Sequence, residues 1–217
     1  MTTEKTALTL QDTHSPALRI WHWGSALTIM ALLCTVLISS TLLDTGSNIP
    51  VIQDKLNEKG VVITRDVAKA VAKKLENQVW QWHKYLGVAL SFLFLFRIII
   101  EIALPKGMSL KAKIRKALFL RKAEPANKNI RHYLWVKLVY LFFYLLIFTL
   151  VLTGYGIIYA GDVEVLKPIK GTLKDIHSFC MYGVITFIIL HIGGILRAEL
   201  TDEPGISSVM IHGGKLK

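Results

Sequence analysis

The sequence predicts an all-α membrane protein, a four-transmembrane-helix bundle, and three observations support this class. The chain of 217 residues is 53% hydrophobic with a mean hydropathy of +0.46, which is too apolar for an ordinary soluble domain. Its apolar residues cluster in four runs, each reaching the roughly 18–20 residues that cross a bilayer as a helix. The runs cover residues 20–43, 82–104, 135–160 and 176–196. Tryptophans mark the ends of these runs, as in an aromatic belt at the membrane surface: Trp21, Trp23, Trp80, Trp82 and Trp135.

The runs divide the chain into a transmembrane domain (18–198), an insertion within it (44–79) and a polar tail (199–217). The first run is longer than the apolar core of a signal peptide and ends without a small-residue cleavage site, so we expect it to span the membrane. The insertion predicts two short amphipathic helices divided at Gly60, the second with Thr64 as its N-cap. That second helix either lies on the membrane surface or docks a partner, and the sequence leaves both open.

The distribution of charge predicts the orientation in the membrane. Residues 105–134 hold nine Lys/Arg against one acidic residue, Glu124, whereas residues 44–79 hold six basic and five acidic residues. By the positive-inside rule the 105–134 connection is cytoplasmic, which places both termini in the cytoplasm and the insertion in the periplasm. A basic stretch beside two spans favours contact with anionic lipids over nucleic-acid binding.

Histidine is costly in hydrocarbon, yet four histidines lie in or at the edge of the apolar runs. With the predicted topology, His22 and His191 share the cytoplasmic depth, and His83 and His177 share the periplasmic depth. His177 and His191 are 14 residues apart, which in a helix is about 21 Å and only about 40° short of four full turns. The last helix therefore carries one histidine of each pair.

Two histidines facing each other across apolar helices suit a six-coordinate haem b, with one neutral imidazole on each side of the iron. A zinc or copper site needs three or four ligands at one point, which these two separated pairs do not supply. The two cysteines, Cys34 and Cys180, lie inside apolar runs and form no C-x-x-C motif. The pattern therefore predicts two haem b groups bound between the helices, with His22/His191 and His83/His177 as ligands.

Haem propionates are anionic, and several cations lie at suitable depths. Arg19 precedes His22 by one turn, and Arg97 follows His83 by 14 residues, at the cytoplasmic depth. Arg97 has an equally good alternative as the ion-pair partner of Glu101 at i+4. Lys84 and Lys174 are placed for the periplasmic haem, and all three of Arg19, Lys84 and Lys174 could instead be interface anchors.

The motifs "RIWHW" in the first span, "WHKYLG" in the second and H-x13-H in the fourth resemble the prokaryotic cytochrome b561 family. The tail "RAELTDEPGISSVMIHGG" resembles the b-type cytochrome subunit of membrane-bound nickel–iron hydrogenases, where a similar S-x-M-I-x-G follows the last helix. The resemblance implies a multi-pass protein of the bacterial cytoplasmic (inner) membrane. It implies His22, His83, His177 and His191 as the haem ligands, with electrons moving between a periplasmic partner and membrane quinone.

We therefore expect a di-haem b-type cytochrome that transfers electrons between a periplasmic redox protein, or hydrogenase or dehydrogenase subunits, and the quinone pool. This interpretation favours an electron-transfer subunit of a membrane oxidoreductase complex over a complete enzyme. The alternative is a stand-alone quinone-linked oxidoreductase acting on a small periplasmic reductant such as superoxide, with lysines steering the anion.

Overall fold

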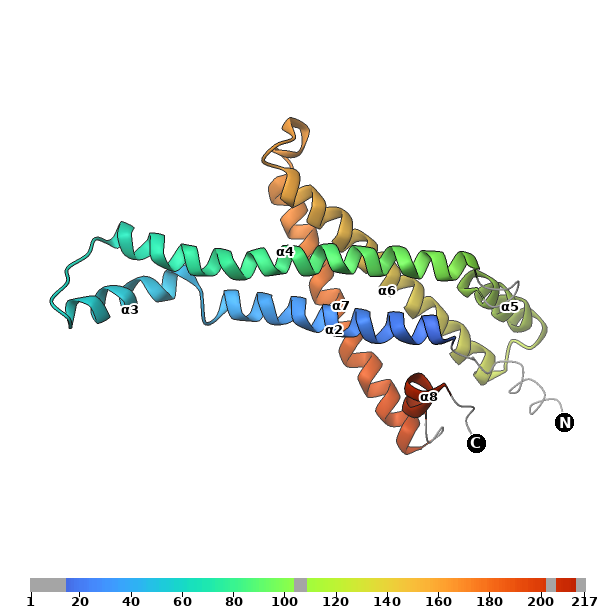
Figure 1. Ribbon diagram of the computed structural model, residues 1–217. Coiled ribbons are helices and arrows are strands. Elements are labelled where there is room, and N and C mark those ends of the chain that lie inside the picture. The colour runs from blue at the N-terminus through green and yellow to red at the C-terminus, as the bar shows by residue number, and fades with distance from the viewer. Residues whose placement is uncertain (1–14, 104–108, 202–205, 214–217) are drawn as a thin grey trace. The chain divides into compact units, whose positions relative to one another are not determined.

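The computed structural model describes residues 15–103, 109–201 and 206–213, and within these ranges all regular structure is helical (Figure 1). Four helices are long and apolar enough to cross a membrane, so the expected all-α class with four spans is confirmed. They are α2 (Pro16–Ser40), α4 (Arg65–Ala103), α6 (Lys128–Tyr159) and α7 (Lys170–Leu200). Shorter helices join them: α3 (Thr45–Asn57), α5 (Leu110–Ala123), the 3-10 turn η1 (Glu164–Leu166) and α8 (Ile206–His212).

Some sequence-based expectations fall outside the described residues. These are the end of the second apolar run at Leu104, the start of the basic connection at Pro105, and parts of the 199–217 tail.

The second half of the insertion is helical, but it is not a separate helix. It begins at the predicted cap, where the Val67 N–H donates to Thr64 Oγ1 at 3.4 Å, and it continues without a break into the second span. At 1.5 Å per residue, the 39 residues of α4 extend about 58 Å, well beyond a hydrocarbon core of about 30 Å. The expected boundary near residue 80 is a change of polarity, and no glycine or proline near it interrupts the helix.

The chain forms two compact units. One comprises Met1–His22 and Phe94–Lys217, and the other comprises Trp23–Leu93. In the first unit α6 and α7 run side by side, and α5 packs against α6 (Figure 1). Gly183 of α7 allows this approach, because a Cβ there would meet both terminal carbons of Leu146 at 3.1 Å. The basic connection is thus an ordered helix in part, α5, capped by Ser109.

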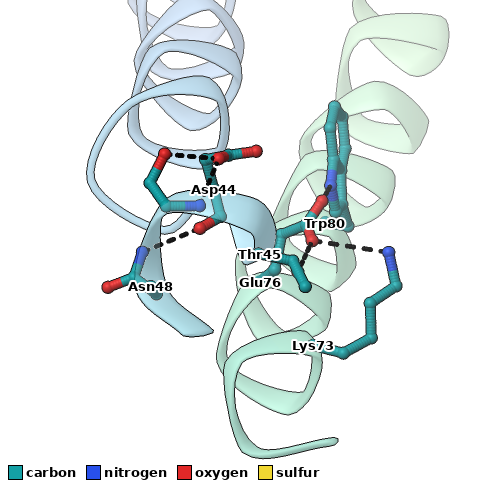
Figure 2. Close-up of polar contacts among 7 residues, drawn as sticks. Asp44, Thr45, Asn48, Lys73, Glu76 and Trp80 are labelled. Atoms are coloured by element: carbon teal, nitrogen blue, oxygen red, sulfur yellow. Dashed lines mark hydrogen bonds and ion pairs between the residues drawn. The ribbon is translucent and has the colours of Figure 1, made fainter. Parts of the chain in front are cut away.

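In the second unit α3 turns back beside the start of α4 (Figure 1). Asp44 caps α3: its Oδ1 accepts from the Ser47 N–H at 2.9 Å and from the Ser47 hydroxyl at 2.7 Å. The next residue, Thr45, donates its hydroxyl to Glu76 Oε2 of α4 at 2.5 Å (Figure 2). Glu76 also accepts from the Trp80 indole at 3.0 Å and pairs with Lys73 at 3.4 Å. This network ties the insertion to the beginning of the second span.

Large apolar side chains along the four long helices are exposed, including Leu27, Phe92, Phe142 and Leu190. Such continuous apolar surface is unfavourable in water and is the surface that lipid tails cover. Trp23, Trp82 and Trp135 are exposed, as an aromatic belt requires. Trp21 differs from that expectation, because it is buried within the first unit.

Replacing Asp44 by alanine should speed amide hydrogen exchange in the first turn of α3, because the Ser47 N–H loses its side-chain acceptor. The two bonds from Ser47, first that of its hydroxyl, hold the pKa of the Asp44 carboxyl below its usual value. A carboxyl with a folded pKa below its unfolded value stabilises the fold above the unfolded pKa. That contribution is lost as pH falls through the folded pKa.

The matched control is Asp44→Asn, since asparagine caps a helix equally well without titrating in this range. After correction for intrinsic exchange, the wild-type first turn should lose protection on acidification while the Asn variant does not. The same acid response in both proteins would contradict the assigned role of Asp44.

Candidate functional site

The four histidines of interest lie on three helices and all are half-buried. His22 is on α2, His83 is on α4, and His177 and His191 are both on α7. Because α7 is unbroken from Lys170 to Leu200, the predicted separation of about 21 Å on nearly one face applies to the last two. His22, His177 and His191 belong to the first unit and His83 to the second, so each is considered in its own surroundings.

The structure brings His22 and His191 together. Their ring centroids lie 6.2 Å apart with an angle of 62° between the planes. Phe187 stacks on His191 at 5.5 Å, and Phe143 stacks on Phe187 at 4.2 Å. The α6–α7 packing therefore orients the His191 ring, which lies next to the His22 ring.

His83 is supported from two sides within the second unit. Thr35 Oγ1 of α2 lies 2.7 Å from His83 Nδ1, and the Trp80 ring lies edge-on to the histidine at 5.3 Å. Trp80 is in turn held by its bond to Glu76, which Thr45 also contacts (Figure 2). The insertion thus reaches the histidine through a chain of contacts. Trp80 supports a candidate ligand and is more than an interface residue.

His177 has a similar arrangement in the first unit. Thr153 Oγ1 of α6 lies 2.9 Å from His177 Nδ1. The neighbouring Gly154 also faces the ring, since a Cβ there would lie in van der Waals contact with His177 Cε1 at 3.5 Å. The third span, which offers no histidine within its apolar run, therefore supplies the surroundings of this one.

Sequence reasoning missed Thr35 and Thr153. Both are buried hydroxyl residues inside otherwise apolar spans. A polar side chain at that depth is a signal in itself, since it must find a partner away from water. The sequence contained that signal, but not the identity of the partner.

Arg97 is the partner of Glu101, the alternative that its i+4 spacing indicated. Its Nη1 lies 2.9 Å from Glu101 Oε2, and its Nε–H donates to the Tyr144 hydroxyl at 3.1 Å. The guanidinium also lies over the rings of Tyr144, at 5.1 Å, and Trp21, at 5.6 Å. These contacts explain why Trp21 is buried, and they satisfy a cation that is only 8% exposed.

Glu101 and Arg97 also line a cavity of about 510 Å³. The surface that faces this cavity is almost entirely apolar, and its lining also includes Phe94, Ile98, Ile114, Leu141, Tyr144 and Lys111. The Glu101 carboxylate in addition accepts the Leu110 N–H, which joins the end of α4 to the start of α5.

Arg19 is held by the C-terminal segment. Its Nη1–H donates to the Ile211 carbonyl at 2.9 Å. Gly213 lies against the guanidinium, and its φ of +74° is a backbone conformation that favours glycine. The Arg19 Nε–H is buried and has no hydrogen-bond partner among the described residues. One turn from His22, this cation therefore retains a donor for an anionic group.

The remaining predicted cations, Lys84 and Lys174, are exposed. Within the described ranges no three His, Cys, Asp or Glu side chains cluster as a metal site would require. His22 and His191 form one imidazole pair in the first unit, a donor set that suits haem iron.

Replacing Glu101 by glutamine should lower the thermal unfolding midpoint in detergent, because it leaves the buried Arg97 without its counter-charge. Glutamine keeps an acceptor for the Leu110 N–H, so the change isolates the ion pair. In the double variant with Arg97→Met the loss should be smaller than the sum of the single losses, with a coupling of about 0.5–3 kcal/mol. Strictly additive losses would show that the pair contributes nothing.

Comparison with known proteins identifies the family. The family model described as prokaryotic cytochrome b561 matches residues 13–213, a range that includes all four histidines, Arg19 and Arg97. Neither a curated protein nor a solved structure matches the chain. With its four apolar helices, the chain is thus a multi-pass bacterial membrane protein. It belongs to the prokaryotic cytochrome b561 family, the membrane-embedded b-type cytochromes that bind haem b and take part in electron transfer.

Proposed function

We propose that this protein is a di-haem cytochrome that carries electrons between a periplasmic redox partner and membrane quinone, as a subunit of a membrane oxidoreductase complex. The observation that carries the proposal is the approach of His22 and His191, whose ring centroids lie 6.2 Å apart, so that the two residues would hold one haem between them. His83 and His177, each with its Nδ1 beside a threonine hydroxyl, are the proposed ligands of the second haem.

Haem b, when bound, supplies a one-electron iron couple. The protein's part is to present neutral imidazoles and to keep water away. It also has to balance the propionate charges. Arg19 suits the last task at the cytoplasmic haem, since its Nε–H is buried and has no partner among the described residues. Arg97 already contacts Glu101 and Tyr144, so a propionate bound to Arg97 would share the guanidinium with these two residues.

We place the quinone in the cavity beside Arg97 and Glu101. A quinone has an apolar tail, and the surface of this cavity is almost entirely apolar; Glu101 and Tyr144 are among the lining residues, with their polar atoms paired to Arg97. The basic helix α5, with Lys111 at the cavity, lies next to it on the proposed cytoplasmic side. This orientation places both termini in the cytoplasm.

The haem content tests the proposal directly. A pyridine haemochrome assay on purified protein should give two haem b per chain. Replacing any one of His22, His83, His177 and His191 by alanine should remove one haem or convert it from low spin to high spin. The matched control is His132→Ala, an exposed histidine at the start of α6, which should keep both haems. Two intact low-spin haems in any of the four variants would remove that histidine from the ligand set.

The quinone site has its own test. Ile98→Trp should fill the cavity and slow reduction of the haems by a quinol about tenfold or more, with the haem content unchanged. Ile99→Trp, on the adjacent residue outside the cavity lining, is the control and should leave the rate near wild type. Equal rates in the two variants would place the quinone elsewhere. Reduction of quinone by superoxide with the isolated chain would favour the stand-alone enzyme instead.

A further inference from the structure

Two buried threonines stand in the same relation to two histidines. In the second unit Thr35 Oγ1 of α2 lies 2.7 Å from Nδ1 of His83 on α4. In the first unit Thr153 Oγ1 of α6 lies 2.9 Å from Nδ1 of His177 on α7. The threonines are 8% and 5% exposed, so water does not compete for either bond. The two contacts involve different helices, yet each joins a threonine Oγ1 to a histidine Nδ1.

The position of the proton in these contacts follows from a second bond of each hydroxyl. Thr35 Oγ1 lies 2.6 Å from the Leu32 carbonyl oxygen, and Thr153 Oγ1 lies 2.7 Å from that of Thr149. Two oxygens at such distances need a proton between them, and a carbonyl cannot supply it, so the hydroxyl donates to the carbonyl. The single hydroxyl proton is then used, and the threonine oxygen accepts from the ring.

The ring nitrogen facing each threonine therefore carries the proton. A neutral imidazole protonated at Nδ1 has its lone pair at Nε2, the form that a metal binds. Each threonine thus selects the tautomer and fixes the ring orientation before any metal arrives.

We propose that Thr35 and Thr153 are positioning residues that hold His83 and His177 ready, through Nδ1–H···Oγ1 bonds, for Nε2 coordination of the second haem. This inference rests on the proposed assignment of these two histidines as ligands. A hydrogen bond from Nδ1–H also makes Nε2 a stronger donor, which stabilises the oxidised iron and lowers its reduction potential. The backbone carbonyl behind each hydroxyl orients the acceptor, so the support of the second haem extends into α2 and α6.

The test replaces each threonine by valine, which keeps the shape and removes the acceptor. In Thr35→Val and Thr153→Val one of the two haem potentials should rise, and haem retention at that site should weaken about 10–100-fold. The ferric EPR signal of the same haem should shift, because the ring orientation is released. Thr→Ser at either position restores a hydroxyl and should return the potential towards the wild-type value.

Controls separate positioning from loss of the fold. Thr28→Val and Thr186→Val remove hydroxyls that donate to backbone carbonyls in the same way, to Gly24 and Tyr182, and should leave both potentials unchanged. Within each threonine variant the haem of His22 and His191 is an internal control, and its potential should also be unchanged.

The outcomes distinguish this inference from the proposed function. If His83→Ala and His177→Ala each disturb one haem while Thr35→Val and Thr153→Val leave its potential and EPR signal unchanged, the threonine role is wrong and the ligand assignment stands. Equal shifts of both potentials, or a serine variant that behaves like valine, also overturn the positioning role. If His83→Ala and His177→Ala keep two low-spin haems, the ligand assignment itself fails.

Discussion

The constraint on which the rest of this structure depends is that an imidazole in a membrane span must have a defined partner at each nitrogen. Hydrocarbon offers no hydrogen bonds, so the protein has to supply a partner for whichever nitrogen is not used for binding. Threonine hydroxyls meet this need at His83 and His177. At His191 the ring plane is instead set by stacking on Phe187. These contacts fix the orientation of the His83 and His177 rings, which the proposed haem ligation requires.

The cations of the first unit also need partners inside the protein, and Arg97 and Arg19 have different ones. Arg97 is neutralised inside the protein by Glu101 and covered by two aromatic faces, so it is a structural element as well as a candidate for the proposed propionate and quinone sites. Arg19 is held by a backbone carbonyl of the C-terminal segment, which carries no charge. The tail motif then has a physical explanation, because its isoleucine supplies the carbonyl and Gly213 adopts a positive φ against the guanidinium.

The insertion illustrates where local reasoning succeeds and where it fails. Thr64 was identified as a helix cap because capping depends on neighbouring residues, and the cap is present. The same reasoning ended that helix too early, because a change from polar to apolar composition does not interrupt a backbone that lacks glycine or proline at the boundary. Trp21 was assigned to the membrane interface from its position along the chain. Its burial against Arg97 depends on a residue far away in the sequence.

By itself the sequence determined the helical class, the four spans and the spacing of His177 and His191 along one helix. All of these depend on hydrophobic run length and on the fixed rise and turn of a helix, which are local quantities. Only the tertiary structure decided which side chains meet. Thr35 and His83 are 48 residues apart, Thr153 and His177 are 24 apart, Arg97 and Tyr144 are 47 apart, and Arg19 and Ile211 are 192 apart. Such pairs are set by how helices pack and by which rotamers fit between them, and the periodicity of a single helix does not encode either.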